Sequence, residues 1–404
     1  MKRTLVVVSI LATLLVIACP AIAAPEIIWT TNPSNNSMPS IATAPSGGVY
    51  LASSVYPFPG GGTQFATIAH YSNTGEEVWK TTIDNARNYF VQSDSLGNVY
   101  ITGETYTNLN DNPSLGGSDV FLNKYSPSGT LLWDRQIGTP EYDFLSGLDV
   151  SATGTAYITV GGCAAHCDTT LPDSVTAIHQ FSADGTPGWV SDLDPGNGSH
   201  PCAFSSGFTG TAIDSQGNIF AAFMNYVLDG MFHNTSSYLS KTNAEGQVQW
   251  IKPLDASNLN TIDTDSADNI ILATDYSLKK YDSNGDLVWS YSDDSAILSA
   301  VIVAPDDTIY VAGNHSTNGY VAAYSSNGSP LWSQDIPPNR ADATLRFQDL
   351  TLSENQLVLA GEHFGFNLGY NNYLVALAVP EPSTLLLLTS MTFLLLGKRF
   401  RIRQ

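Results

Sequence analysis

The stretch GGSDVFLNKYSPSGTLLW, from Gly116 to Trp133, contains the pattern that decides the fold. An aromatic-rich segment runs into a turn at Gly129, and the returning segment carries Trp133 four residues later. Glycine accepts the positive φ at which a chain reverses, so the pattern predicts a β-hairpin. The same spacing of glycine and tryptophan recurs along the chain, ending at Trp79, Trp133, Trp189, Trp250, Trp289 and Trp332.

A second hairpin pattern lies between consecutive copies of the first. In one instance the turn residues 94–98 (DSLGN) are followed by the alternating apolar segment 99–103 (VYITG). Seven such segments occur: APSGGVYLAS, DSLGNVYITG, SATGTAYITV, DSQGNIFAAF, DSADNIILAT, APDDTIYVAG and LSENQLVLAG. Two hairpins give four antiparallel strands in about fifty residues, the unit of a β-propeller blade. The sequence therefore predicts an all-β, seven-bladed β-propeller over residues 24–379; a two-sheet sandwich would not generate seven phased tryptophans.

The two ends of this region predict how the ring closes. The last unit has a third strand at 373–378 but no fourth strand before Pro380. Residues 27–31 (IIWTT) form an orphan strand that carries Trp29 without the preceding glycine. We expect this N-terminal strand to complete the last blade, which removes an open sheet edge.

These repeats resemble a known family. GGSDVFLNKYSPSGTLLW together with DSLGNVYITG is similar to the SBBP-type β-propeller repeat of secreted bacterial proteins, and loosely to quinoprotein-like repeats, over roughly residues 25–378. A quinoprotein dehydrogenase is the natural enzyme rival, but that resemblance would imply eight blades, adjacent cysteines and a calcium-binding carboxylate set, which the sequence lacks. We expect no cofactor.

The charge of the chain restricts its partners. The 404 residues include 16 Lys+Arg and 37 Asp+Glu, for a net charge of -21. Six basic residues lie at the two ends, so residues 24–379 hold 10 basic against 36 acidic side chains, a net charge of about −26. Such a surface repels phosphate backbones, which excludes nucleic acid as a partner and makes anionic lipid unfavourable.

Residues 1–23 have the three parts of a secretory signal peptide, which we expect to be helical. Lys2 and Arg3 form the charged start, an apolar segment follows, and Ala21 and Ala23 form the small-residue cleavage site. Cleavage after Ala23 is expected. An alternative is that the loose lipobox 16–19 (VIAC) makes Cys19 a lipidated N-terminus.

Residues 380–404 resemble the PEP-CTERM sorting tail of Gram-negative bacteria. The motif is Pro380, Glu381 and Pro382; an apolar segment, expected to be helical, spans 384–397; and the basic cluster is Lys398, Arg399, Arg401 and Arg403. The resemblance implies an exosortase-type processing enzyme as a partner and a transient inner-membrane anchor, followed by release to the cell envelope, the surface or the medium. The alternative is a plain C-terminal membrane anchor.

The two faces of the predicted ring differ. The turns between strands 1 and 2 and between strands 3 and 4 are short and share one side, the tight-turn face. The other connections form the loop face, and we expect long irregular loops at 54–64, 104–118, 163–174, 225–237 and 362–372. Binding residues concentrate on loops of rigid scaffolds. The loop face, with His166, His200, His233, His315 and His363, is therefore the candidate binding face; the alternative is that these are the variable loops of a structural disc.

Cysteines and acidic clusters suggest further sites. Cys163, Cys167 and Cys202 remain after signal removal, and in an oxidising exterior we favour a disulfide from Cys202 to either Cys163 or Cys167. A zinc site with His166 and His200 is a weaker alternative, and no metal is expected. The calcium-like segment 282–286 (DSNGD) has its glycine at the wrong position, which favours a hairpin turn. Asp263 and Asp265 are expected on an inner strand beside the central channel, where they are an alternative candidate for holding a cation.

No catalytic motif is present: the chain has no GxSxG, HExxH or P-loop pattern. We therefore expect a non-enzymatic module that binds or scaffolds exopolysaccharide or matrix protein. The rival is a propeller lyase or hydrolase that uses histidine and aspartate residues of the loop face. A close cluster of two or three loop histidines with a carboxylate would favour the enzyme.

Overall fold

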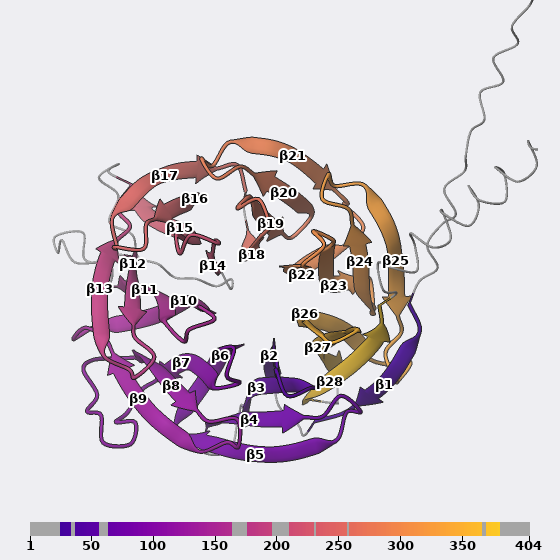
Figure 1. Cartoon of the computed structure of the whole chain (residues 1–404), viewed down its shortest axis with the longest axis horizontal. Helices are drawn as coiled ribbons and strands as arrows, with labels where there is room; N and C mark the ends of the chain where they lie inside the picture. The colour runs from indigo at the N-terminus through magenta and orange to yellow at the C-terminus, as the bar shows by residue number, and fades with distance from the viewer. Residues whose placement is uncertain are drawn as a thin grey trace, which may run out of the picture.

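The computed structural model describes residues 25–33, 37–55, 64–163, 176–195, 210–229, 232–256, 258–365 and 369–379. These residues form seven four-stranded antiparallel sheets arranged around a central axis (Figure 1). The predicted all-β, seven-bladed propeller is thereby confirmed. The expected signal and C-terminal helices lie outside the described residues, and within those residues no helix has the length and hydropathy needed to cross a bilayer.

Each blade runs from an inner strand at the axis to an outer strand at the rim (Figure 1). Blade 1 consists of β2 (Ser37–Thr43), β3 (Val49–Val55), β4 (Phe65–Tyr71) and β5 (Glu77–Asp84). Blades 2 to 4 are β6 (Ala86–Ser93), β7 (Val99–Thr105), β8 (Asp119–Tyr125), β9 (Leu131–Ile137); β10 (Tyr142–Val150), β11 (Ala156–Cys163), β12 (Thr176–Phe181), β13 (Pro187–Asp192); and β14 (Thr211–Ile213), β15 (Ile219–Asp229), β16 (Phe232–Thr242), β17 (Val248–Leu254). Blades 5 to 7 are β18 (Leu259–Thr264), β19 (Ile270–Thr274), β20 (Ser277–Tyr281), β21 (Leu287–Ser292); β22 (Ile297–Val303), β23 (Ile309–His315), β24 (Asn318–Tyr324), β25 (Pro330–Ile336); and β26 (Thr344–Ser353), β27 (Gln356–Gly365), β28 (Gly369–Ala378), β1 (Ile27–Thr31).

The seventh blade closes the ring as the sequence predicts. The N-terminal strand β1 pairs antiparallel with β28, with Trp29 opposite Ala376 and Thr31 opposite Leu374. The backbone amide of Ala378 also donates to the carbonyl of Glu26 at 2.9 Å. The fourth strand of this blade is therefore supplied by the other end of the chain.

The tryptophans of the outer strands join neighbouring blades. The indole of Trp79 in blade 1 lies on the turn of blade 2, where a Cβ added to Gly129 would meet its ring at 2.9 Å. The indole N–H donates to the carbonyl of Pro127 in the same turn at 2.9 Å. The equivalent pairs are Trp29 on Gly75, Trp133 on Gly185, Trp189 on Gly246, Trp250 on Gly285 and Trp289 on Gly328. The glycine of each motif thus makes room for the tryptophan of the preceding blade, in addition to permitting the turn, where φ is 81° at Gly129.

The middle strands are buried because both faces of each blade are covered by neighbours. Every residue of β7 and of β8 is buried. Apolar clusters lie between adjacent blades, as where Tyr50 and Ile68 of blade 1 pack with Phe121 of blade 2. This packing makes the ring a rigid support for whatever its two faces present.

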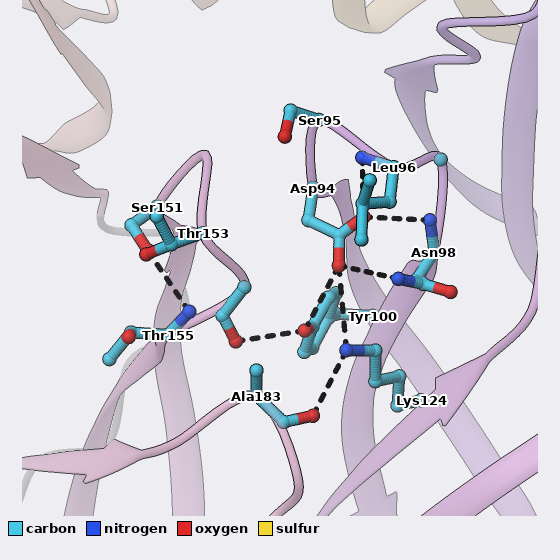
Figure 2. A network of polar contacts seen from close by, with 12 residues as sticks. Asp94, Ser95, Leu96, Asn98, Tyr100, Lys124, Ser151, Thr153, Thr155 and Ala183 are labelled. Carbon is cyan, nitrogen blue, oxygen red and sulfur yellow. Dashed lines mark hydrogen bonds and ion pairs between the residues drawn. The ribbon is translucent and has the colours of Figure 1, made fainter.

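Buried polar networks occupy the tight-turn face (Figure 2). In blade 2, the Lys124 ammonium lies 3.4 Å from the Asp94 carboxylate and donates to the carbonyl of Ala183 in the next blade at 3.0 Å. The Tyr100 hydroxyl donates to the carbonyl of Gly154 at 2.8 Å. The same ion pair recurs as Asp214 with Lys241 and as Asp265 with Lys280. These polar groups serve the contact between blades.

Candidate binding site in the central channel

The inner strands of all seven blades surround a cavity of about 780 Å³. Its volume lies within the usual range of small-ligand pockets, roughly 300–1,000 Å³. The lining comes from β2, β6, β10, β14, β18, β22 and β26, and includes Tyr89, Phe90, Gln92, Asp149, Thr211, Asn260, Asp263, Ser299, Arg346, Gln348 and Asp349. The cavity is therefore built on the rigid part of the ring.

Side chains of neighbouring blades satisfy backbone amides on the inner strands. The Asp149 carboxylate accepts from the amide of Ile213 at 2.9 Å, and the Asp263 carboxylate accepts from the amide of Val303 at 2.7 Å. The remaining contacts of this kind are Ile41 to Asp349 at 2.9 Å, Val91 to Ser40 at 3.2 Å and Val301 to Thr261 at 2.8 Å. These contacts join the blades at the axis and leave fewer backbone donors for a ligand.

Three of these aspartates are surrounded by protein, although each residue keeps some contact with the channel. Burial raises the pKa of Asp149 to about 7, against the opposing effect of the amides of Val150 and Ile213. Burial likewise raises the pKa of Asp263 and of Asp349 to about 6. The negative charge around the channel therefore increases between acidic and neutral pH.

Two blades carry the same group of side chains toward the loop face. In blade 7, Arg346 stands opposite Glu362 in the ladder, and its guanidinium carbon lies 5.6 Å from the ring centre of Phe364. Gln348 donates to Glu362 at 2.7 Å. Blade 2 repeats the arrangement with Arg87 opposite Glu104, Arg87 at 5.5 Å from the ring of Tyr106, and the Tyr89 hydroxyl donating to Glu104 at 3.2 Å. Sequence reasoning missed both groups.

The structure describes the side chains of two of the five predicted loop histidines. His315 ends β23, is half-buried, and has Nδ1 3.1 Å from Asp335 Oδ2. His363 lies within β27, where it is buried against the ring of Tyr373 and burial lowers its pKa. Neither residue lines the central cavity.

The other predicted loop residues lie mostly outside the described residues. His233 belongs to β16, where its backbone pairs with Leu228. His166, His200, Cys167 and Cys202 fall outside the described ranges, whereas Cys163 ends β11. The disulfide and the zinc alternative therefore stay predictions.

Two of the expected long loops are largely strand instead. Segment 225–237 belongs mostly to the eleven-residue strands β15 and β16, with Tyr226 paired to Thr235. Segment 362–372 likewise continues β27 and β28, with His363 paired to Asn371. The prediction of irregular loops there was wrong because polar residues such as threonine and asparagine suggested a loop, whereas here they extend a ladder.

The acidic candidates for cation binding separate in the structure. The turn at 282–286 is a hairpin turn, in which Asp282 accepts from the amides of Asn284 and Asp286, both at 2.9 Å. Asp263 lines the channel as expected. Asp265 does not lie on the inner strand: it follows β18 in the turn and pairs with Lys280 at 2.6 Å. Within the described part of the chain, no three histidine, cysteine or carboxylate side chains come together as metal ligands.

The chain is similar to known proteins in family and in fold. The model of the PQQ_2 family, described as outer membrane protein assembly factor BamB, matches residues 173–386. The RRP9 WD40 repeats are 11% identical with a TM-score of 0.58, covering 88% of this chain and 99% of that one. The polysaccharide lyase Uly1 is 10% identical with a TM-score of 0.51 (89% and 100% covered), and the WD40 propeller domain of Doa1 is 11% identical with a TM-score of 0.50 (88% and 97% covered). These structural likenesses concern the fold alone, and no curated protein matches the chain.

Proposed function

We propose that this chain, which belongs to the PQQ_2 family described as outer membrane protein assembly factor BamB, is an exported module that binds or scaffolds extracellular material. The material is exopolysaccharide or matrix protein. The observation that carries the proposal is the cavity of about 780 Å³ enclosed by seven inner strands. A family description that names an assembly factor also supports a binding role over a catalytic one.

The two faces of the ring support a division of labour. On the tight-turn face, Lys124 pairs with Asp94 of its own blade and donates to the carbonyl of Ala183 in the next blade, so such buried groups hold the blades together. The loop face carries the longer connections and the start of inner strands such as β26, where Arg346 and Gln348 line the cavity. A ligand that enters from the loop face therefore meets side chains that take no part in the contacts between blades.

Export rests on the two terminal segments of the sequence. Residues 1–23 direct secretion in this proposal, and residues 380–404 anchor the chain transiently in the inner membrane until an exosortase-type enzyme acts at Pro380, Glu381 and Pro382. The basic cluster after residue 397 stays on the cytoplasmic side, which leaves the acidic body outside. Its final location is the cell envelope, the surface or the medium.

The rival enzyme reading is less well supported. A lyase or hydrolase of the predicted kind needs clustered loop histidines with a carboxylate. Among the described residues, His315 pairs with Asp335 on one blade, whereas His363 is buried on another. No histidines and carboxylates within the described ranges form the cluster that this enzyme would need.

The proposal is tested with residues 24–379 on a glycan array and in pull-downs of extracellular matrix. A variant with the cavity obstructed, Ser299→Trp, is compared with Leu96→Trp, which adds the same side chain to a residue that is 79% exposed on the tight-turn face. We expect binding by the unmodified body and by Leu96→Trp, and loss of binding by folded Ser299→Trp. Absence of binding to all glycans and matrix fractions would overturn the proposal.

A further inference from the structure

Arg346 is the one cationic side chain in the described lining of the central cavity. Its Nε is buried and has no hydrogen-bond partner among the described residues. The guanidinium makes a cation–π contact with the ring of Phe364. Two other basic side chains of the described body show the contrast: Lys280 pairs with Asp265, and Arg340 pairs with Asp342. Arg346 therefore lines the cavity as a cation that makes no ion pair within 4.0 Å in the described part of the chain, although Glu362 stands opposite it in the ladder.

The acidic groups near Arg346 are bonded elsewhere. Glu362 accepts from Gln348, and Asp349 accepts from the amides of Ile41 and Leu350 and from the hydroxyl of Ser40. A guanidinium in partly desolvated surroundings gains most from a carboxylate, because its planar fork matches the two carboxylate oxygens. The guanidinium of Arg346, which lines the cavity and has no ion pair among the described residues, thus favours a ligand that brings its own carboxylate.

The inner strands favour a carbohydrate over an extended peptide. A peptide that binds by strand addition needs free backbone donors along a sheet edge. Here the amides of Ile41, Ile213 and Val303 are already bonded to side chains of the preceding blade. In contrast, the side chains of Gln92 and Ser299 line the cavity and make no hydrogen bond in the described structure, so they suit the hydroxyl groups of a sugar.

The levels of these residues fit an oligomer longer than one sugar. Arg346 lies near the start of β26, close to the loop face, whereas Gln92 is next to the end of β6, close to the tight-turn face. When the two strands are aligned on the turns that follow them, Arg346 lies five residues further from its turn than Gln92 does. At about 3.3 Å per residue, the two positions differ in height along the channel by roughly 16 Å. A ligand that reaches both levels spans much of the channel.

We propose that the cavity binds an acidic oligosaccharide, with a uronic acid carboxylate paired to Arg346 at the loop-face mouth and neighbouring hydroxyl groups bonded to Ser299 and Gln92. This assignment rests on the proposed function and names its ligand class. The acidic body repels polyanions over distances comparable to the Debye length, about 10 Å at 0.1 M salt. Added salt screens this long-range repulsion more than it screens the pair of carboxylate and Arg346 inside the cavity. The affinity for the acidic oligosaccharide should therefore stay constant or rise between about 50 and 200 mM salt.

The test uses the full chain in mild detergent and two matched probes. One is a tetrasaccharide with a single glucuronate, and the other is its carboxyl-reduced, neutral counterpart. We expect isothermal titration calorimetry to give at least about tenfold weaker binding of the neutral probe, the usual effect of a charge-assisted hydrogen bond. Arg346→Gln should bind both probes at the neutral level, and Arg346→Lys should be intermediate. Arg340→Gln, which removes an exposed and already paired arginine, should change neither affinity.

Several results would overturn the assignment. Equal binding of the two probes by the unmodified chain contradicts the assignment. This comparison needs no variant, so it tests the assignment even if the Arg346 variants fail to fold. Unchanged glucuronate affinity in folded Arg346→Gln also contradicts it, as does tighter binding of an acidic peptide than of the glucuronate probe. In these cases binding to other matrix material leaves the proposed function standing, whereas absence of binding to any glycan or matrix fraction removes both.

Discussion

The docking of tryptophans on glycines gives a sharp prediction for Gly129→Ala, because the chain contains a matched control. Gly129 has φ of 81°, and an added Cβ would meet the Trp79 ring at 2.9 Å. Gly217 has φ of 80° in another tight turn, and an added Cβ would meet the Ala244 Cβ at 3.6 Å, an ordinary contact. Both variants therefore place alanine in the same backbone conformation, but only Gly129→Ala displaces an indole.

The expected magnitudes follow from these two contacts. Alanine in the left-handed region costs about 1–2 kcal/mol, which applies equally to both variants. Overpacking against the rigid ring of Trp79 adds roughly 1–3 kcal/mol in total, a cost that includes the weakened hydrogen bond from the displaced indole to Pro127, itself about 1 kcal/mol. We expect Gly129→Ala to lower the free energy of unfolding by about 1–3 kcal/mol more than Gly217→Ala.

Urea unfolding followed by tryptophan fluorescence measures both variants, and a double mutant isolates the contact. In a Trp79→Ala background the ring is absent, so Gly129→Ala should cost no more than Gly217→Ala does. The resulting coupling energy should be about 1–3 kcal/mol. Equal destabilisation by the two glycine variants, or additive effects of Gly129→Ala and Trp79→Ala, would refute the docking account.

Three further predictions concern charge and processing. Lys124→Ala should lower the free energy of unfolding by about 3–5 kcal/mol because it removes the cation paired with buried Asp94, whose remaining donors, such as the amides of Leu96 and Asn98, are neutral. Lys252→Ala, whose partner is 73% exposed, should cost under about 1 kcal/mol. Chemical denaturation compares the two variants, and similar losses would contradict the account. The pKa of Asp149, raised to about 7 from an ordinary value near 4, means that the native state binds more protons than the unfolded state between those pH values. Its contribution to stability is therefore present below pH 4 and lost as pH rises to 7, by at most about 4 kcal/mol, and Asp149→Asn should flatten that part of the pH profile measured by denaturant unfolding; an unchanged profile would count against it. Glu381→Ala should leave the C-terminus unprocessed in mass spectra of the exported protein, and normal processing would count against the exosortase assignment.

The blade count and the ring closure were predictable because both leave periodic marks in the sequence. Each blade repeats a tryptophan at its outer strand, and the strand carrying Trp29 lacks a partner hairpin. The second role of the glycines was not predictable from one repeat. The contact of Trp79 with Gly129 depends on how consecutive blades are placed, and that placement arises only when the ring closes.

The candidate site was harder to predict because its residues share no single chemical type. Inner-strand positions such as Gln92, Ser299 and Arg346 look like ordinary small or polar residues until seven strands meet at the axis. One signal was available: aligned on their first turns, blades 2 and 7 place Arg87 and Arg346 at the same position, each opposite a glutamate. The segment 225–237 shows the opposite error: its polar residues suggested a loop, whereas the backbone pairs as a β-ladder, which hydrophobicity alone does not predict.

The central claim is that ligand binds in the channel from the loop face. Amide hydrogen exchange of residues 24–379, with and without a bound glycan identified on the array, measures this location residue by residue. The account predicts added protection at the loop-face ends of inner strands, including 345–349 in β26, and no change in the tight turns at 126–130 and 182–186. Protection confined to those turns or to the outer strands would contradict it.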